Sequence, residues 1–177
     1  MATQPTDTGA AETSPAAKTP LYLTIAWVLL LLLGAFMVFA ALSDLAADAG
    51  AGLPSDHLAA FASVAGASWQ TARQTSAGIA HYVTLLEVGY AFHELVSGLL
   101  FLVIVAIPFR RRALWAWWAC WIPMIANIAY TLTFGAHDPA ILRTSLIADI
   151  ALPVLLLVQA PAFFGRRAAA VRKAQAA

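Results

Sequence analysis

Charged residues are scarce in this chain. Asp, Glu, Lys and Arg make up 11% of its 177 residues, whereas 62% are hydrophobic. A water-soluble globular domain carries about 25% charged residues, so this chain has too much apolar surface to cover in water. The formal net charge of +1 excludes the dense basic face of a nucleic-acid-binding protein. The composition predicts an integral membrane protein, with the lipid bilayer as its main partner and no nucleic acid.

Cysteine and the common catalytic motifs are also rare or absent. Cys120 is the only cysteine, which excludes an intramolecular disulfide and any metal site with several cysteine ligands. Neither a glycine-rich phosphate loop nor a nucleophile elbow occurs. The sequence HELVS, residues 93–97, begins like a zinc signature, but Ser97 stands where the second histidine ligand would be. We therefore expect no metal site.

Four apolar segments are long enough to cross a bilayer, whose hydrocarbon core of about 30 Å needs about 20 apolar residues in a helix. They cover residues 21–43, 81–109, 113–134 and 139–164. The first exceeds the apolar region of a signal peptide and has only Lys18 before it, so we interpret it as a retained helix. The sequence predicts an all-α fold, a four-helix transmembrane bundle over residues 21–164.

Three other segments complete the predicted organisation. Residues 1–20 hold no bulky apolar residue except Met1 and are predicted to be a disordered tail, and residues 165–177 form a basic tail. In the loop of residues 44–80, apolar residues recur at the spacing of one helix face. These residues are Leu58, Phe61, Ala62, Ala65, Trp69 and Ala72. We predict one amphipathic helix there, on the membrane surface or capping the bundle.

The basic residues predict the orientation. Eight of the ten precede the first span, follow the fourth, or lie between the second and third, and only Arg73 and Arg143 fall on the other side. The positive-inside rule then places both termini in the cytoplasm. The many alanines are typical of a GC-rich bacterial genome, so we expect a multi-pass protein of a bacterial inner membrane.

The turn between the second and third spans reads RRRALWAWWACW, residues 110–121. Its tryptophans stand at the depth of an interfacial aromatic belt. In length, in its four spans and in this arginine-then-tryptophan turn, the chain resembles the small bacterial four-helix membrane proteins of the DoxX-like kind. The resemblance implies architecture only and carries no functional residue.

Polar residues inside the predicted spans are the candidate functional residues, since an ionisable group near the bilayer centre costs about 2.5–3.5 kcal/mol. Glu87 and Glu94 are seven residues apart and share one helix face. Depth along the helices predicts two groups. The outer group contains Glu87, Asn127, Thr131 and Arg143, with Tyr90 nearby, and the midplane group contains His93, Glu94 and Asp149.

Arg143 is expected to need a carboxylate partner. It falls in the first turn of the fourth helix, where a positive charge meets the unfavourable end of the helix dipole. Glu87 is the first candidate and Asp138 the second. Asp138 and Pro139 also read as the cap and first residue of that helix. Pro123 and Pro153 should bend the third and fourth helices.

Three functional hypotheses follow from these residues. The first is an accessory or scaffold subunit of a larger membrane complex, whose protein partners would be other subunits or a second copy. The second is a module that binds or transports a small molecule, lipid or ion through the intramembrane Glu, His, Asp and Arg residues. The third, less favoured, is a membrane-embedded enzyme with Glu94, Asp149 and His93 as acid and base. No cofactor is expected. A haem remains an alternative that would need His81 and His137 to pair.

Overall fold

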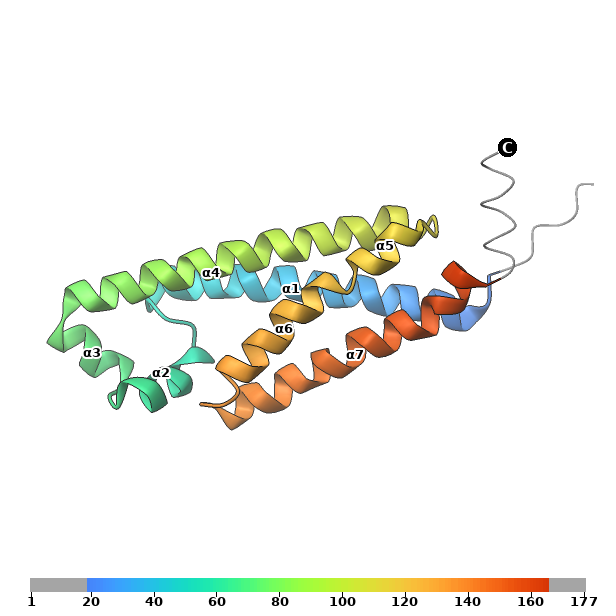
Figure 1. Ribbon diagram of the computed structural model, residues 1–177. Coiled ribbons are helices and arrows are strands. Elements are labelled where there is room, and N and C mark those ends of the chain that lie inside the picture. The colour runs from blue at the N-terminus through green and yellow to red at the C-terminus, as the bar shows by residue number, and fades with distance from the viewer. Residues whose placement is uncertain (1–18, 166–177) are drawn as a thin grey trace, which may run out of the picture.

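The computed structural model describes residues 19–165, and every regular element in that part of the chain is a helix (Figure 1). The predicted tails therefore lie outside the described residues, except for residues 19, 20 and 165. Three helices are long and apolar enough to cross a membrane. They are α1 (Leu21–Gly50), α4 (Ala77–Ile104), which continues into the π-helical turn η1 (Val105–Phe109), and α7 (Pro139–Phe164).

The predicted third span is broken. It consists of α5 (Leu114–Ala119) and α6 (Ile122–Thr133), and neither is long enough to cross a bilayer alone. Pro123 explains the break, because its ring has no N–H and excludes the carbonyl four residues before it. The helix therefore stops ahead of Pro123, which stands in the first turn of α6. The bend predicted at Pro123 is thus a change of helix.

The loop between α1 and α4 forms two helices, α2 (His57–Ala65) and α3 (Trp69–Thr75), where one was predicted. Gly66 separates them with a left-handed backbone, φ 66°, which glycine adopts without steric penalty. The Ser68 hydroxyl then caps α3 by accepting from the Thr71 N–H. The buried residues of α2 are His57 and Ala60, whereas Leu58 of the predicted apolar face is 40% exposed.

Two helix pairs make up the body of the bundle. In Figure 1, α1 lies along α4, and α6 lies along α7, with α1 also contacting α7. The α1–α4 pair is tight because glycines stand at the interface. A Cβ on Gly98 would lie 3.1 Å from the Met37 Cβ and from the Val38 backbone nitrogen. The main core, which includes Leu30, Phe101 and Leu156, lies toward the end that carries Arg110.

The α2 and α3 helices lie at the opposite end of the bundle (Figure 1). There the side chain of His57, the first residue of α2, reaches Glu87 of α4 and Tyr130 of α6. Asp138 caps α7 by accepting from the Ala140 N–H, and Pro139 is its first residue, as predicted. Most large apolar side chains on the outer faces of α1, α4 and α7 are exposed, as expected of helices that face lipid.

Candidate functional site

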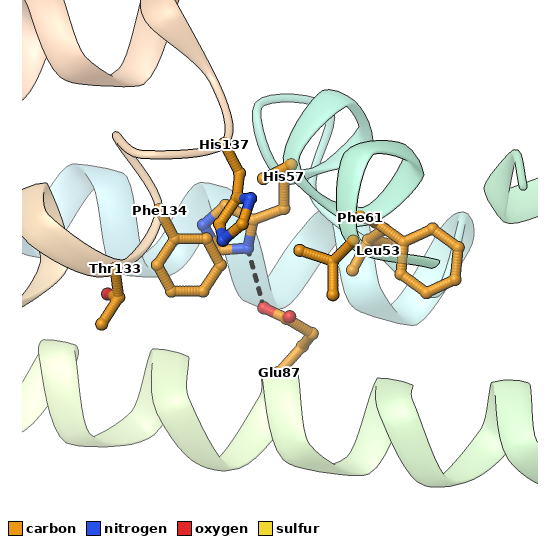
Figure 2. A pocket seen from close by; sticks show the side chains of 9 residues that line it. Leu53, His57, Phe61, Glu87, Thr133, Phe134 and His137 are labelled. Carbon is orange, nitrogen blue, oxygen red and sulfur yellow. Dashed lines mark hydrogen bonds and ion pairs between the residues drawn. The ribbon is translucent and has the colours of Figure 1, made fainter. Parts of the chain in front are cut away.

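His57 is the centre of the polar structure at this end of the bundle. It starts α2 and is 2% exposed. Its Nδ1 donates to Glu87 Oε2 of α4 over 2.8 Å, and its Nε2 lies 3.2 Å from the Tyr130 hydroxyl of α6. Its ring also stacks on Phe134, with the ring centres 4.8 Å apart. One side chain therefore joins the loop helix to α4 and α6. Figure 2 shows its contact with Glu87 of α4.

The charge of His57 is set by two opposing effects. Burial alone lowers the pKa of this imidazole, because it disfavours the charged form, whereas the hydrogen bond and negative charge of Glu87 raise it. The net result is a pKa above the ordinary value of 6.5. The ring therefore keeps its proton to a higher pH than a free histidine, and in the protonated form its contact with Glu87 is a charge-assisted hydrogen bond within an ion pair.

A pocket of about 300 Å³ adjoins this pair. Figure 2 shows Phe134 and His137 on one side of the His57–Glu87 pair and Leu53 and Phe61 on the other. The remaining lining residues are Ala60, Val64 and Thr133. The wall is therefore mainly carbon, and its polar groups are concentrated at the His57–Glu87 pair and at His137.

A second polar group joins α6 to α7. The Asp149 carboxylate accepts from Asn127 Nδ2 at 2.6 Å and from the Thr131 hydroxyl at 2.7 Å. Asn127 and Thr131 are four residues apart, so both lie on the face of α6 that meets α7. Each carboxylate oxygen receives one hydrogen bond, which compensates for taking this group out of water.

The structure places the predicted partners of Arg143 elsewhere. Glu87 pairs with His57, and Asp138 caps its own helix. Arg143 is exposed and makes no hydrogen bond or ion pair within residues 19–165. The predicted Arg143–Glu87 and Arg143–Asp138 pairs are therefore wrong, because Arg143 is on the outer face of α7 and the loop supplies a cation for Glu87.

The predicted midplane group does not form. The Asp149 carboxylate takes its hydrogen bonds from two residues of the predicted outer group. His93 is exposed, and its Nδ1 bonds to the Gly89 carbonyl of its own helix at 2.7 Å. Glu94 is half-buried without a hydrogen bond to any described residue. Tyr90 stacks on Tyr130, with ring centres 6.2 Å apart, and so lies beside the His57 site.

Sequence reasoning missed His57, Tyr130 and Phe134. His57 comes one residue before the first apolar residue of the periodic pattern in the loop. The pattern therefore gave no reason to place its side chain on the buried face of a helix. Tyr130 and Phe134 are four residues apart and share one face of the third apolar segment. This aromatic pair, at the same depth as Glu87, could have indicated that the third segment contributes to the site around Glu87.

Within residues 19–165, no three His, Cys, Asp or Glu side chains gather closely enough to hold a metal ion. Of the two histidines considered for a haem, His137 lines the pocket, whereas His81 is exposed on α4. The single cysteine, Cys120, is fully buried in the core.

Comparisons with family models, with curated proteins and with solved structures find no match to this chain. The resemblance to DoxX-like proteins thus remains an expectation about architecture.

Proposed function

We propose that this membrane protein binds a small, mainly apolar molecule in the pocket beside His57. One observation carries the proposal: a carbon-lined cavity of about 300 Å³ has a His–Glu ion pair in its wall. Ligand sites are typically apolar cavities with a few fixed polar groups that orient the ligand. Val64 lines this cavity and is 68% exposed, so a ligand has access from the surface.

The polar groups indicate what the ligand would present. Both ring nitrogens of His57 and the Oε2 atom of Glu87 are already engaged. Glu87 Oε1 makes no hydrogen bond to a described residue and accepts only, since a carboxylate has no donor. A ligand with an apolar body and one hydroxyl or amine group fits this arrangement.

Purification in a mild detergent followed by native mass spectrometry tests the proposal. Ala60 is buried and lines the pocket, whereas Ala59 is exposed on the same helix and does not. We expect the wild type and Ala59→Leu to retain the same small molecule. Ala60→Leu, which fills the pocket, and Glu87→Gln, which removes its charge, should lose it. Retention by Ala60→Leu with an unchanged melting temperature would contradict the proposal, as would a wild type that carries nothing.

A second candidate is an accessory subunit of a larger membrane complex. One charged residue favours it: Arg143 lies on the membrane-length helix α7 and makes no hydrogen bond or ion pair with a described residue. Such groups are costly in lipid unless a neighbour compensates them. A photoreactive residue at Leu146, beside Arg143, should then crosslink to one partner in native membranes. The same residue at Phe36, on α1, is the control, and equal labelling at both positions would argue against a specific partner.

We also propose four crossings, with α5 and α6 together forming the third. The support is geometric, because these helices connect the end that carries Arg110 to the end that carries α2 (Figure 1). The triple arginine then lies on the cytoplasmic side together with both termini. Residence in a bacterial inner membrane follows from the same orientation and from the composition.

A further inference from the structure

A second pocket lies at the opposite end of the bundle, about 260 Å³ in volume. It is bounded by the start of α1, by η1 and the turn after it, and by the end of α7. Its lining includes Thr19, Trp27, Phe109, Arg110, Arg112 and Gln159. Unlike the pocket beside His57, it combines apolar rings with two guanidinium groups.

Both arginines are held at this pocket by the fold. The Arg110 guanidinium lies 5.0 Å from the centre of the Trp27 ring, a cation–π distance. Trp27 is fixed in turn, because its Nε1 donates to the Val105 carbonyl over 2.9 Å. Arg112 has a left-handed backbone, φ 59°, which is uncommon for a residue other than glycine. Its Nη2 reaches Thr19 Oγ1 at 3.5 Å across the pocket.

The two positive charges lack a counter-ion within the described chain. The one ion pair in residues 19–165 is His57–Glu87, at the other end of the bundle. Gln159 Nε2 donates one of its two hydrogens to the Leu23 carbonyl over 2.6 Å and carries no charge. An anion that enters the pocket would therefore meet two guanidinium groups and no carboxylate among the lining residues.

We propose that this pocket binds the phosphate of an anionic phospholipid headgroup. Guanidinium groups recognise phosphate through paired, charge-assisted hydrogen bonds. Basic pockets between transmembrane helices at the cytoplasmic surface are typical sites for anionic headgroups. The apolar part of the lining and the exposed side chains Ile25 and Val28 of α1 provide a path for acyl chains. Inorganic phosphate shares the headgroup chemistry but would leave this apolar surface unused.

Arg111 supplies a matched control. It has the same charge and the same turn, is exposed, and does not line the pocket. The experiment measures retention of one lipid per protein by native mass spectrometry after exchange with phosphatidylglycerol, phosphatidylcholine or inorganic phosphate. We expect the wild type to retain phosphatidylglycerol selectively. Arg110→Gln and Arg112→Gln should each weaken retention by about fivefold, whereas Arg111→Gln should leave it unchanged and Arg112→Lys should restore part of it.

Three results would overturn the proposal. Equal losses of lipid retention in all three glutamine variants would mean that the lipid is attracted by the positive charge of the whole turn and not bound in this pocket. Equal retention of phosphatidylcholine, whose choline group cancels the phosphate charge, would mean that the pocket does not select a headgroup with net negative charge. Binding of inorganic phosphate with no lipid retained would make this a site for a free anion. Melting temperatures without added lipid, which should match among the variants, exclude unfolding as the cause of a loss.

Discussion

His57 Nδ1 lies 2.8 Å from Glu87 Oε2, and this contact joins the loop between α1 and α4 to α4, near the end of the bundle that carries α3. The two residues are thirty positions apart in the sequence. The imidazole is almost fully covered and the carboxylate is 16% exposed, so neither can exchange its partner for water without moving. The position of α2, and with it one wall of the pocket, depends on this pair.

The stability of the protein should decrease as the pH rises from mildly acidic to mildly alkaline. The folded state holds the His57 proton to a higher pH than the unfolded state, whose pKa is about 6.5. The pair's contribution is therefore fully present below pH 6.5, and it is lost as the pH rises through the folded-state pKa. Melting temperatures in detergent between about pH 5 and pH 9 measure this dependence.

Two variants test whether His57 causes this pH dependence. Glu87→Gln removes the charge that raises the His57 pKa, so its melting temperature should vary less with pH than that of the wild type. His93→Gln changes an exposed histidine that bonds only within its own helix, and it should keep the wild-type pH dependence. A wild-type pH dependence in Glu87→Gln would show that another group is responsible.

Thr131→Ala should destabilise the protein by about 1.5–3 kcal/mol, the range for a hydrogen bond to a charged group. The Thr131 hydroxyl donates to Asp149 and so connects α6 with α7. Thr133 is on the same helix, but its hydroxyl bonds only to carbonyls of that helix, so Thr133→Ala should change stability by less. Denaturant unfolding measures the difference, and hydrogen exchange should rise over residues 122–133 in Thr131→Ala alone. If the two variants lose the same stability, the hydrogen bond to Asp149 is not the cause of the loss.

Gly98→Leu should separate α1 from α4. The added side chain would meet the Met37 Cβ and the Val38 backbone within about 3.2 Å, and overpacking of this kind costs about 1–3 kcal/mol. Gly89 stands on the same helix, and a Cβ added there would have no neighbouring atom within 4 Å. Gly89→Leu should therefore be neutral or slightly stabilising, because leucine has the higher helix propensity. Thermal unfolding of the two variants in one detergent compares them directly.

Cysteine labelling tests the proposed third crossing. In a Cys120→Ala background, a cysteine at Arg111 reports on the turn after η1, and one at Ala136 reports on the exposed loop between α6 and α7. If α5 and α6 cross the bilayer, a membrane-impermeant maleimide added to intact cells should label the cysteine at 136 and not the one at 111. Labelling of both positions from the same side would mean that this broken helix re-enters without crossing.

Several features were predictable from the sequence because they depend on residues close together in the chain. The three membrane-length helices follow from runs of apolar residues, whose length and hydropathy are local properties. The start of α7 follows from Asp138 and Pro139, because a cap and a first-turn proline act on the adjacent backbone. Pro123 signalled a disturbance in the third apolar segment. The structure shows a full helix break there rather than the predicted bend.

The partners of the polar residues were decided by tertiary structure. Sequence spacing placed Glu87 and Glu94 on one face of α4, but it could not give the rotation of α7 that turns Arg143 outward. Nor could sequence spacing show that the loop brings the His57 side chain to Glu87 of α4 and Tyr130 of α6. Hydropathy acts on each segment separately, so it predicted the three membrane-length helices but not the extension of α1 to Gly50 or the division of residues 113–134 into two helices. Hydrogen bonds and ion pairs act over about 3 Å between segments far apart in the chain, so only the packed bundle determined which side chains form the site.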